Sequence, residues 1–585
     1  MPRERSVVFL LLAIVTVGMT VSLTGQTTRA LTITVDSLTD DFSDDGKCSL
    51  REAIQNANDT SDGQPREDCS AGDPAGEDTI TFSVQGVIVL SGQLPPIVDD
   101  LVLVGGNDIT LDGDDGRILS VEAGASLTVE ELAFQHGQAA AGGAIHVASG
   151  AMVVNSSQFM NNRADHGGAI DVADGDLSVS NSVFTGNEAL GPGGAITIAE
   201  GSLRISGSTF TENVGGEGQG AGAIYAMNAP VTINGGEFNG NSVGPGGAGG
   251  AIIVEAALAI QGTGFHGNSA VSGGAIFVIE GPGVQISGAS FSNNEATFYA
   301  GGAITALVPL QVTGSTFHDN SAPQGGAIAH DLATASVSTS VFTGNTATTL
   351  GGAAYLGTPE GATTVFRRNT YSENKAKNGG AVYAVQGSVH LLESTFSVNS
   401  AITGGAIYNT GTIEVLNSTI SGNEGGGLLN EGDATVRHAT FADNASVGVA
   451  GILNTPSASL SIANTAIATG EFGVNCELNG TVNGPPGSNL SDDGSCDVPA
   501  FVKVEALLLG PLANNGGPTF THLPATGSPV IDAGNLGTCL SDDQRGEPRP
   551  TNAGCDIGAV EVEEVPFVPA GDLFLPNLAA QVDHP

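Results

Sequence analysis

A short glycine-rich motif recurs through the middle of the chain at a nearly constant spacing. The motif is GGAI or a close variant, and its second glycine stands at positions 143, 168, 194, 222, 250, 274, 302, 326, 352, 380, 405, 427 and, weakly, 451. The mean period is about 26 residues. A fixed period of this size is typical of proteins in which each repeat forms one layer of a stack.

A second motif, an aromatic residue three positions before an asparagine (FxxN), alternates with the first. Its aromatic residues are Phe159, Phe184, Phe210, Phe238, Phe265, Phe291, Phe317, Phe342, Tyr371 and Phe396, and Ile420 and Phe441 close the series. Between the motifs lie short alternating runs such as LSVSNSVF and AITIAE, which have the period of strands. Gly, Asn, Ser and Asp separate these runs and favour turns.

These patterns predict an all-β fold, a single-stranded parallel β-helix solenoid in which each repeat forms one coil. A unit with two or three short strands cannot bury a face alone, but stacked units can. We expect the Ile of GGAI to point into the core and the Phe of FxxN to stack on the Phe of neighbouring coils. We expect the Asn to lie in a turn and to bond the next coil's Asn or the backbone.

The alternation of GGA[ILV] and FxxN over residues 134–454 resembles the repeats of chlamydial polymorphic outer-membrane proteins. Those proteins are surface adhesins, so the resemblance implies a right-handed β-helix exposed at a cell surface. The resemblance does not extend beyond residue 454. It therefore carries the fold and the surface exposure, but not the self-transport of that family.

Both ends of the repeat resemble modules of secreted bacterial β-helix proteins. Residues 31–80 resemble the module named after its Cys-Ser-Leu-Arg-Glu-Ala run, which here begins at Cys48. Residues 455–562 resemble the C-terminal module of choice-of-anchor proteins, through NGGPTFTHLPATGSPVIDAGN, DQRGEPRP and CDIGAVE. We expect both modules to cap the exposed strands of the end coils. Residues 81–133 then form the first irregular coils, and residues 563–585 form a tail.

Residues 1–30 have the pattern of a signal peptide. Arg3 and Arg5 precede a long apolar run, and Ala30 is the expected cleavage residue. A retained N-terminal membrane anchor is the alternative interpretation, because the apolar run is long. Elsewhere the sequence has no run apolar enough to span a bilayer. We therefore expect a secreted or cell-surface protein.

All six cysteines lie outside the repeat, and they form three pairs in which the two cysteines are near each other in the sequence. An even number in an exported chain favours disulfides. Pairing by proximity joins Cys48 to Cys69, Cys476 to Cys496, and Cys539 to Cys555.

The charge balance argues against nucleic acid as a partner. The chain has 17 Lys and Arg against 61 Asp and Glu, a formal net charge of −44. Binding to nucleic acid depends on clustered basic residues that displace counterions.

The acidic stretch DFSDDGKCSLRE, residues 41–52, has two interpretations. Asp41, Ser43, Asp45 and Glu52 have the spacing of oxygen ligands in a calcium loop, which predicts a structural calcium ion. Alternatively, Ser49 and Glu52 form the capping box of a helix. The two interpretations are compatible, since a helix that leaves a calcium loop begins within it.

In each repeat, the residue immediately after the Ile of the GGAI motif is expected to point outward, so these residues form one line along the solenoid. Polar residues occupy it at His146, Asp171, Thr197 and Thr305. Aromatic residues occupy it at Tyr225, Phe277, Tyr355, Tyr383 and Tyr408. These side chains either stiffen an exposed face by stacking, or form a stripe that binds a glycan or a protein of a host or neighbouring cell.

Two functions follow from these observations. The first is a non-catalytic adhesin or structural scaffold, for which no catalytic residue is assigned. The second is a carbohydrate-active enzyme of the pectate-lyase-like class, a polysaccharide lyase or a glycosidase. A lyase would draw on the basic group Arg367, Arg368, Lys375 and Lys377, and a glycosidase on a pair among Asp165, Asp171, Asp174 and Asp176.

Overall fold

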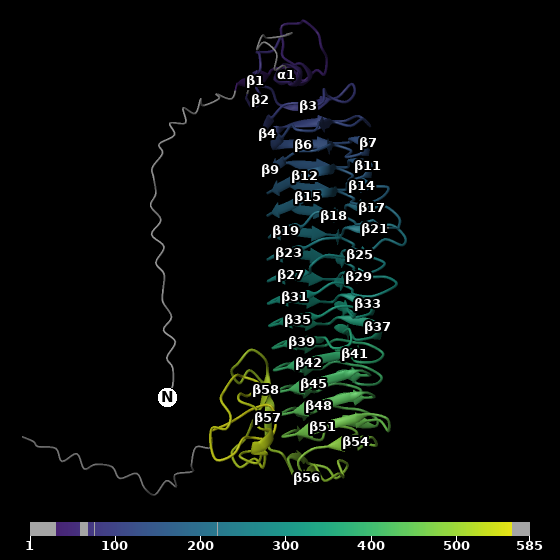
Figure 1. Cartoon of the computed structure of the whole chain (residues 1–585), viewed down its shortest axis with the longest axis vertical. Coiled ribbons are helices and arrows are strands. Elements are labelled where there is room, and N and C mark those ends of the chain that lie inside the picture. The colour runs from purple at the N-terminus through teal and green to yellow at the C-terminus, as the bar shows by residue number, and fades with distance from the viewer. Residues whose placement is uncertain (1–30, 59–67, 75, 219, 564–585) are drawn as a thin grey trace, which may run out of the picture.

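The chain folds into a parallel β-solenoid whose coils stack along one long axis (Figure 1). The computed structural model describes residues 31–58, 68–74, 76–218 and 220–563. The expected signal peptide, its cleavage residue Ala30 and nearly all of the expected tail lie outside these residues. The predicted all-β coil architecture is confirmed, since equivalent strands of successive repeats pair in parallel throughout.

The strand that begins at the Ile of GGAI repeats in every coil, and we call the resulting ladder the first row. Its strands are β8 (Ile145–Val147), β12 (Ile170–Ser180), β15 (Ile196–Ser206), β18 (Ile224–Asn228), β22 (Ile252–Val254), β26 (Ile276–Val278), β30 (Ile304–Ala306), β34 (Ile328–His330), β38 (Ala354–Gly357), β41 (Val382–Gln386), β44 (Ile407–Asn409), β47 (Leu428–Asn430), β50 (Val449–Asn454) and β53 (Val474–Leu478). In β12 and β15 the strand continues without a break into the next row.

Two further rows of strands run along the solenoid, and a third is confined to part of it. The second row runs from β1 (Thr32–Val35) to β54 (Thr481–Asn483), and the third carries the FxxN aromatics from β10 (Gln158–Met160) to β55 (Asn489–Ser491). A separate nine-stranded ladder of short strands runs from β7 (Gln138–Ala141) to β37 (Thr346–Leu350). Between these rows the chain turns.

The aromatic residues of FxxN form one continuous stack inside the solenoid, as predicted. Eleven rings from Phe134 to Phe396 follow one another at centroid distances of 4.5–5.0 Å, with interplanar angles of at most 10°. Every ring is nearly completely buried. Tyr371 replaces Phe in one coil, and its hydroxyl accepts a hydrogen bond from the Asn369 amide at 3.4 Å.

The double glycine of GGAI has a steric cause. In one coil, Gly193 has a φ of +69°, which an L side chain rarely adopts. A Cβ on Gly194 would lie 2.0 Å from the carbonyl oxygen of Gly222 in the next coil. The motif therefore recurs because the coils approach each other by their backbones at this turn.

The N-terminal module caps one end of the solenoid, as expected. The helix α1 (Leu50–Ala57) buries Leu50, Ala53 and Ile54, and it packs on β1 and on β2 (Asp78–Phe82) at the end of the stack (Figure 1). The apolar side chains of the module join the continuous core of the coils. The first strand therefore does not leave an open edge at the face that α1 covers.

The C-terminal module differs from its expected role as an end cap. Residues 455–503 continue the coils as far as β56 (Phe501–Lys503), and only residues 504–562 form a separate module. That module folds back along the flank of the solenoid (Figure 1). It docks on the outer side of the third row, where Thr395 donates to the carbonyl of Phe520 at 2.5 Å and Ala559 N donates to Thr440 Oγ1 at 2.9 Å.

The module docks on this flank for a physical reason. The outward positions of the third row in these coils carry small hydroxyl residues, such as Thr395, Thr419 and Thr440, which offer both donors and acceptors to the module.

The three disulfides join the predicted pairs, Cys48–Cys69, Cys476–Cys496 and Cys539–Cys555. No helix among the described residues is long and apolar enough to cross a membrane.

Candidate ligand-binding face

The line that follows the Ile of GGAI forms one ladder of side chains on the first row, which we call the outward line. Its consecutive members are His146, Asp171, Thr197, Tyr225, Ile253, Phe277, Thr305, Ala329, Tyr355, Tyr383, Tyr408, Leu429, Leu453 and Glu477. The five aromatic residues predicted from the sequence all lie on it. Their side chains are separate from the main core of the coils.

Tyr225 does not belong to an exposed stripe, contrary to expectation. It is 5% exposed and packs with Ile253 and Ala221 in a small apolar cluster of its own. Its hydroxyl donates to Glu255 Oε1 at 2.6 Å. The long turns between coils in this region cover the outward line here, so Tyr225 has a packing role that alternation alone cannot reveal.

Tyr355, Tyr383 and Tyr408 form a stacked ladder that solvent reaches. The rings of Tyr355 and Tyr383 are 6.0 Å apart with an interplanar angle of 11°, and those of Tyr383 and Tyr408 are 5.0 Å apart and tilted by 57°. All three side chains are half-buried. Burial, and then a hydrogen bond to Glu431, raise the pKa of Tyr408. The ladder is therefore partly accessible to solvent along three coils.

A pocket opens on the outward line directly before this ladder. Its volume is about 390 Å³, which lies in the range of small-molecule sites. Phe277 and Tyr355 stand at its two ends, and Thr305 and Ala329 between them form its floor. The pocket exists because two consecutive coils place small residues where their neighbours place rings.

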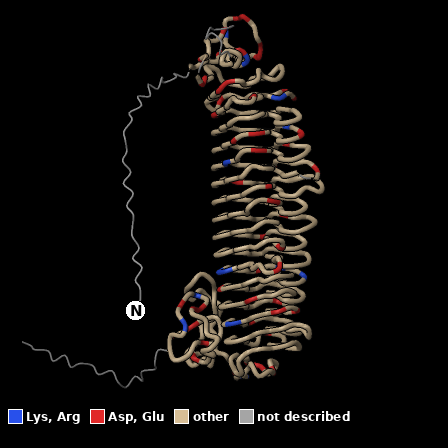
Figure 2. The backbone as a smooth tube through the Cα atoms, in the orientation of Figure 1, with Lys and Arg blue, Asp and Glu red and all other residues tan. Residues whose placement is uncertain are grey.

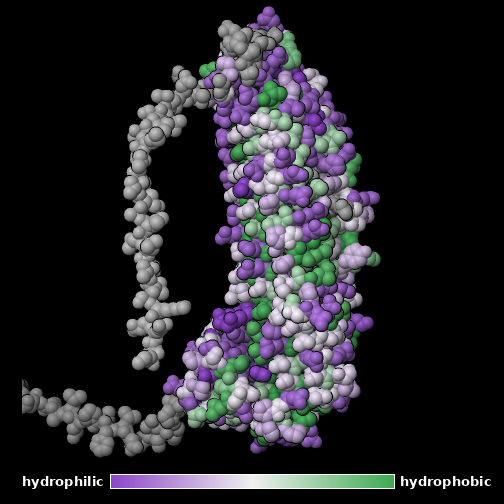
Figure 3. Space-filling view, in the orientation of Figure 1, coloured by the Kyte–Doolittle hydropathy of each residue, from purple (hydrophilic) through white to green (hydrophobic). Residues whose placement is uncertain are grey.

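A second concavity of about 700 Å³ lies on the second row, between β19 (Val231–Asn234) and β39 (Thr363–Arg367). Its floor consists of outward residues without charge, such as Ala259, Gln285 and Gln311. Figure 2 shows that basic residues are sparse along the described coils. In Figure 3 hydrophobic surface gathers among hydrophilic residues over the middle coils.

The comparisons with known proteins agree with this geometry. A family model described as a right-handed β-helix region matches residues 224–420, which include the pocket and the tyrosine ladder. The chain is a right-handed β-helix protein. No curated protein matches the sequence.

The basic group that a lyase would need is largely neutralised in the β-helix. Arg367 and Arg368 both bind Glu393, each at 2.6 Å, through different carboxylate oxygens. The hydrogen bond to Glu393 and its charge raise the pKa of Arg367. Lys375 and Lys377 are exposed. The two arginines therefore form an ion-pair triad rather than a free anion site.

Three of the four acidic residues that a glycosidase would draw on each bind a neighbour on an adjoining coil. Asp171 pairs with His146 Nδ1 at 2.8 Å, and Asp174 accepts from Ser149 at 3.3 Å. Asp176 accepts a hydrogen bond from Ser202 Oγ at 2.5 Å. These contacts tie the coils together along the rows.

The acidic loop at the N-terminal cap forms the helix cap that one of its interpretations predicted. Ser49 N donates to Glu52 Oε2 at 2.8 Å, and Glu52 N donates to Ser49 Oγ at 3.3 Å, which completes a capping box. The other oxygen of Glu52, Oε1, is buried without a hydrogen-bond partner. One carboxylate oxygen is therefore still available to a cation.

The charges of two aspartates act on this carboxylate of Glu52. Burial raises the pKa of Glu52, and the charges of Asp68 and Asp41 raise it further. Asp68 was not identified from the sequence, because it is distant from the loop and returns through the Cys48–Cys69 disulfide. Asp41, Glu52 and Asp68 fit a calcium ion in donor chemistry. Among the described residues, no three of the carboxylates of Asp41, Asp45, Glu52 and Asp68 have ligand atoms within 4.8 Å of one another.

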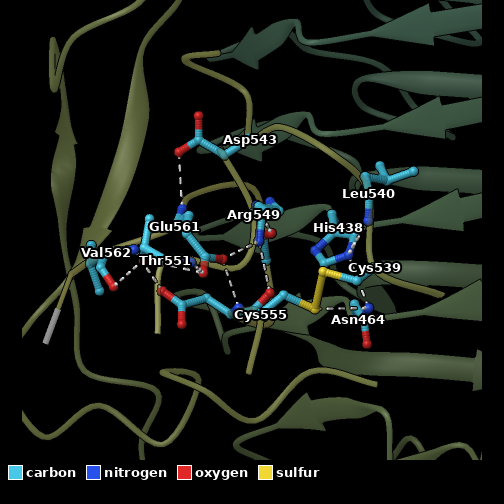
Figure 4. A network of polar contacts seen from close by, with 12 residues as sticks. His438, Asn464, Cys539, Leu540, Asp543, Arg549, Thr551, Cys555, Glu561 and Val562 are labelled. Atoms are coloured by element: carbon cyan, nitrogen blue, oxygen red, sulfur yellow. Dashed lines mark hydrogen bonds and ion pairs between the residues drawn. A yellow bond between two sulfur atoms is a disulfide. The ribbon is translucent and has the colours of Figure 1, made fainter. Parts of the chain in front are cut away.

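His438, Cys539 and Cys555 lie close enough together to suggest a metal site. Among the described residues, they are the only three His, Cys, Asp or Glu side chains whose ligand atoms all lie within 4.8 Å of one another. This group lies where the C-terminal module meets the coils (Figure 4). The two sulfurs form a disulfide, so they are not thiolates that could bind a metal. Asn464 donates to His438 Nε2 at 2.9 Å, which fixes the ring against the module.

The same network contains a buried ion pair that holds the module together. Arg549 Nη1 lies 3.1 Å from Glu561 Oε2, and both side chains are completely buried. Arg549 also donates to the carbonyls of Asp556 and Gly558, at 2.9 and 2.8 Å (Figure 4). Because each of the two charges has hydrogen-bonding partners, we interpret this buried ion pair as a structural element of the module.

Proposed function

We propose that this protein is a non-catalytic binding scaffold displayed outside the cell, which holds a glycan or a surface protein on the outward line of the first row. The observation that carries the proposal is the ladder of Tyr355, Tyr383 and Tyr408. Aromatic rings with a polar tip supply large contact area at low entropic cost. Their regular spacing suits a ligand that itself repeats, such as a polysaccharide.

Several features support a location outside the cell. Three disulfides hold the regions outside the repeat, which is typical of chains that fold in an oxidising compartment. The pattern of residues 1–30 predicts export. The strong negative charge keeps the surface soluble and resistant to self-association.

A carbohydrate-active enzyme is the second candidate, because the fold provides a long concave surface on the second row. This concavity is lined by amides, hydroxyls and small apolar groups such as Gln285, Gln311 and Ser336. Acid–base cleavage of a glycosidic bond needs a pair of carboxylates at the substrate. The aromatic ladder needs none, and for that reason binding is the function we propose.

The experiment separates binding from cleavage. The purified protein is incubated with a panel of polysaccharides, with and without calcium, and both retention and depolymerisation are measured. We expect retention without cleavage, and loss of retention when Tyr355, Tyr383 and Tyr408 are all replaced by Ser. Replacement of Gln285 and Gln311 by Ser, on the second row, is the matched control.

Each outcome has a defined meaning. The triple variant should keep the circular dichroism spectrum and melting temperature of the parent within a few degrees, because its side chains lie outside the main core. Retention that survives the triple substitution would exclude the tyrosine ladder as the binding face. New reducing ends or unsaturated products would instead establish the enzyme.

A further inference from the structure

The pocket before the tyrosine ladder has the dimensions of a site for one or two sugar rings. Phe277 and Tyr355 lie three coils apart on the outward line. Neighbouring strands are about 4.8 Å apart, so the two residues are about 14 Å apart along the axis. Thr305 and Ala329 leave the space between them open.

The exposed Tyr299 lines this pocket, and its ring packs against that of the neighbouring Phe298. Phe298 is 68% exposed and Tyr299 is 62% exposed, and their rings contact edge to face at 4.9 Å. The backbone N–H of Tyr299 donates to the carbonyl of Val271 at 2.9 Å, which anchors the turn. Two adjacent rings this exposed form an apolar patch, and apolar patches on a protein surface often mark binding sites.

Four polar side chains at the pocket make no hydrogen bond within the described part of the chain, whereas the hydroxyls of Ser272 and Thr305 bind the carbonyl of Ala300. The side chains of Tyr299, Gln324, Asp331 and Tyr355 all line it, and none of them takes part in a hydrogen bond there. By contrast, the buried Tyr225 hydroxyl is bound to Glu255. Burial, and then the charge of Asp331, raise the pKa of Tyr355, so these two groups lie near each other.

We infer that this pocket binds neutral pyranose units of a glycan, an inference that rests on the proposed function and names its ligand class. The faces of Tyr355 and Tyr299 receive the apolar C–H face of a sugar ring. The Asp331 carboxylate accepts from two vicinal hydroxyls, and the Gln324 amide both donates and accepts. Each of these solvent-accessible groups then exchanges contact with water for contact with the sugar.

The charge of the site selects against other ligands. None of the described lining residues is Lys or Arg, and Asp331 places a negative charge at the pocket. A uronate or sulfated sugar would meet repulsion there, in a chain of net charge −44.

The test uses titration calorimetry of the full chain with four neutral hexasaccharides, namely cellohexaose, maltohexaose, mannohexaose and chitohexaose, and with hexagalacturonate as the acidic probe. We expect at least one neutral probe to bind and hexagalacturonate to bind at least about tenfold more weakly, a difference of about 1.4 kcal/mol. Three variants address the site: Ala329→Phe fills the floor, Tyr299→Ala removes the exposed ring, and Asp331→Asn removes the charge.

Each of the first two variants should lower the affinity for the neutral probe at least about tenfold. Asp331→Asn should raise relative binding of hexagalacturonate. Phe472→Ala, which removes a ring that is 63% exposed on a distant coil, is the matched control and should change nothing. Tyr299→Ala truncates a side chain in solvent, so its effect cannot arise from misfolding.

The inference is overturned if no neutral probe binds, if hexagalacturonate binds more tightly, or if Ala329→Phe and Tyr299→Ala bind like the parent. Polysaccharide retention that is lost with Tyr383→Ser and Tyr408→Ser but unaffected by the pocket variants overturns this inference alone. It leaves the proposed function in place. Failure of every probe and every polysaccharide to bind overturns both.

Discussion

The side-chain amide of Asn187 donates a hydrogen bond to Oδ1 of Asn213, one coil away, at 2.9 Å, and both side chains are completely buried. The same amide donates to the carbonyl of Phe159 in the preceding coil at 3.0 Å. The relationship recurs in every coil from Asn162 to Asn444, as the FxxN motif predicted. Buried amides in such a chain polarise one another and hold the coils in register.

Removal of one amide from this ladder should destabilise the protein. In Asn268→Ala, the backbone and side-chain donors of Asn241 and the carbonyl of Phe238 lose their partner inside the protein. We expect a loss of about 2–5 kcal/mol in the free energy of unfolding, since each buried unpaired group costs about 1–3 kcal/mol. The midpoint of urea unfolding measures it. Asn234→Ala, at an exposed position of β19, should shift the midpoint little, and an equal shift would contradict the ladder's role.

The C-terminal module should detach from the flank of the coils when Gln544 is replaced by Ala. The Gln544 side chain is completely buried, donates to Thr395 Oγ1 at 3.0 Å and accepts from Thr419 at 2.7 Å. Hydrogen exchange followed by mass spectrometry should show faster exchange within residues 504–562 and unchanged protection in the other coils. Gln285→Ala is the control. Uniform loss of protection along the solenoid would mean that the module is not an independent unit.

Stability should depend on pH through His438. Burial, and then the charge of Arg549, lower the pKa of His438 to about 3 in the folded protein. Between about pH 3 and pH 6.5 the unfolded chain therefore binds one more proton at His438 than the folded chain does. The free energy of unfolding is highest above pH 6.5, where His438 is neutral in both states, and it decreases as the pH falls toward 3. The full effect is on the order of 5 kcal/mol. In His438→Gln, the melting temperature should fall less steeply with acidification.

Asp556 provides a control of opposite sign in the same network. Burial raises the pKa of Asp556 to about 6, so the folded state binds the extra proton between about pH 4 and pH 6. Its contribution to stability is present below pH 4 and is lost as the pH rises through 6. Asp556→Asn should therefore steepen the acid-side slope that His438→Gln flattens. Equal slopes in all three proteins would show that the network does not titrate as a buried unit.

Calcium should stabilise the N-terminal cap. A cation beside Glu52 Oε1 would offset the mutual repulsion of Asp41, Glu52 and Asp68. At a concentration about 100 times the dissociation constant, the gain is about 2.7 kcal/mol, seen as a higher melting temperature. Asp41→Ala should abolish the rise, whereas Asp44→Ala, at a non-ligand position of the loop, should retain it. A melting temperature that millimolar calcium leaves unchanged would exclude the site.

The spacing of the repeat motifs by itself determined most of the fold. The positions of Phe184 and Asn187 predicted a ring stack and an amide ladder, because a solenoid places equivalent residues of successive repeats above one another. The same spacing placed Tyr355, Tyr383 and Tyr408 on one line. The three disulfides also followed from the sequence, since each joins neighbouring cysteines outside the repeat.

Only the tertiary structure determines the contacts that involve the turns and the two terminal modules. Alternation fixes the side of the strand from which Tyr225 projects, but the length of the neighbouring turns decides that it is covered, while Tyr355 remains accessible. The charge of Asp68 acts on Glu52, and Gln544 donates a hydrogen bond to Thr395, across distances in sequence that no periodic pattern encodes. The pocket could not be predicted from the sequence either, because Asp331 and Tyr299 come from different coils and line one pocket only when the coils stack. The periodic part of this protein is local and could be predicted from spacing, whereas its candidate site arises where the period is interrupted.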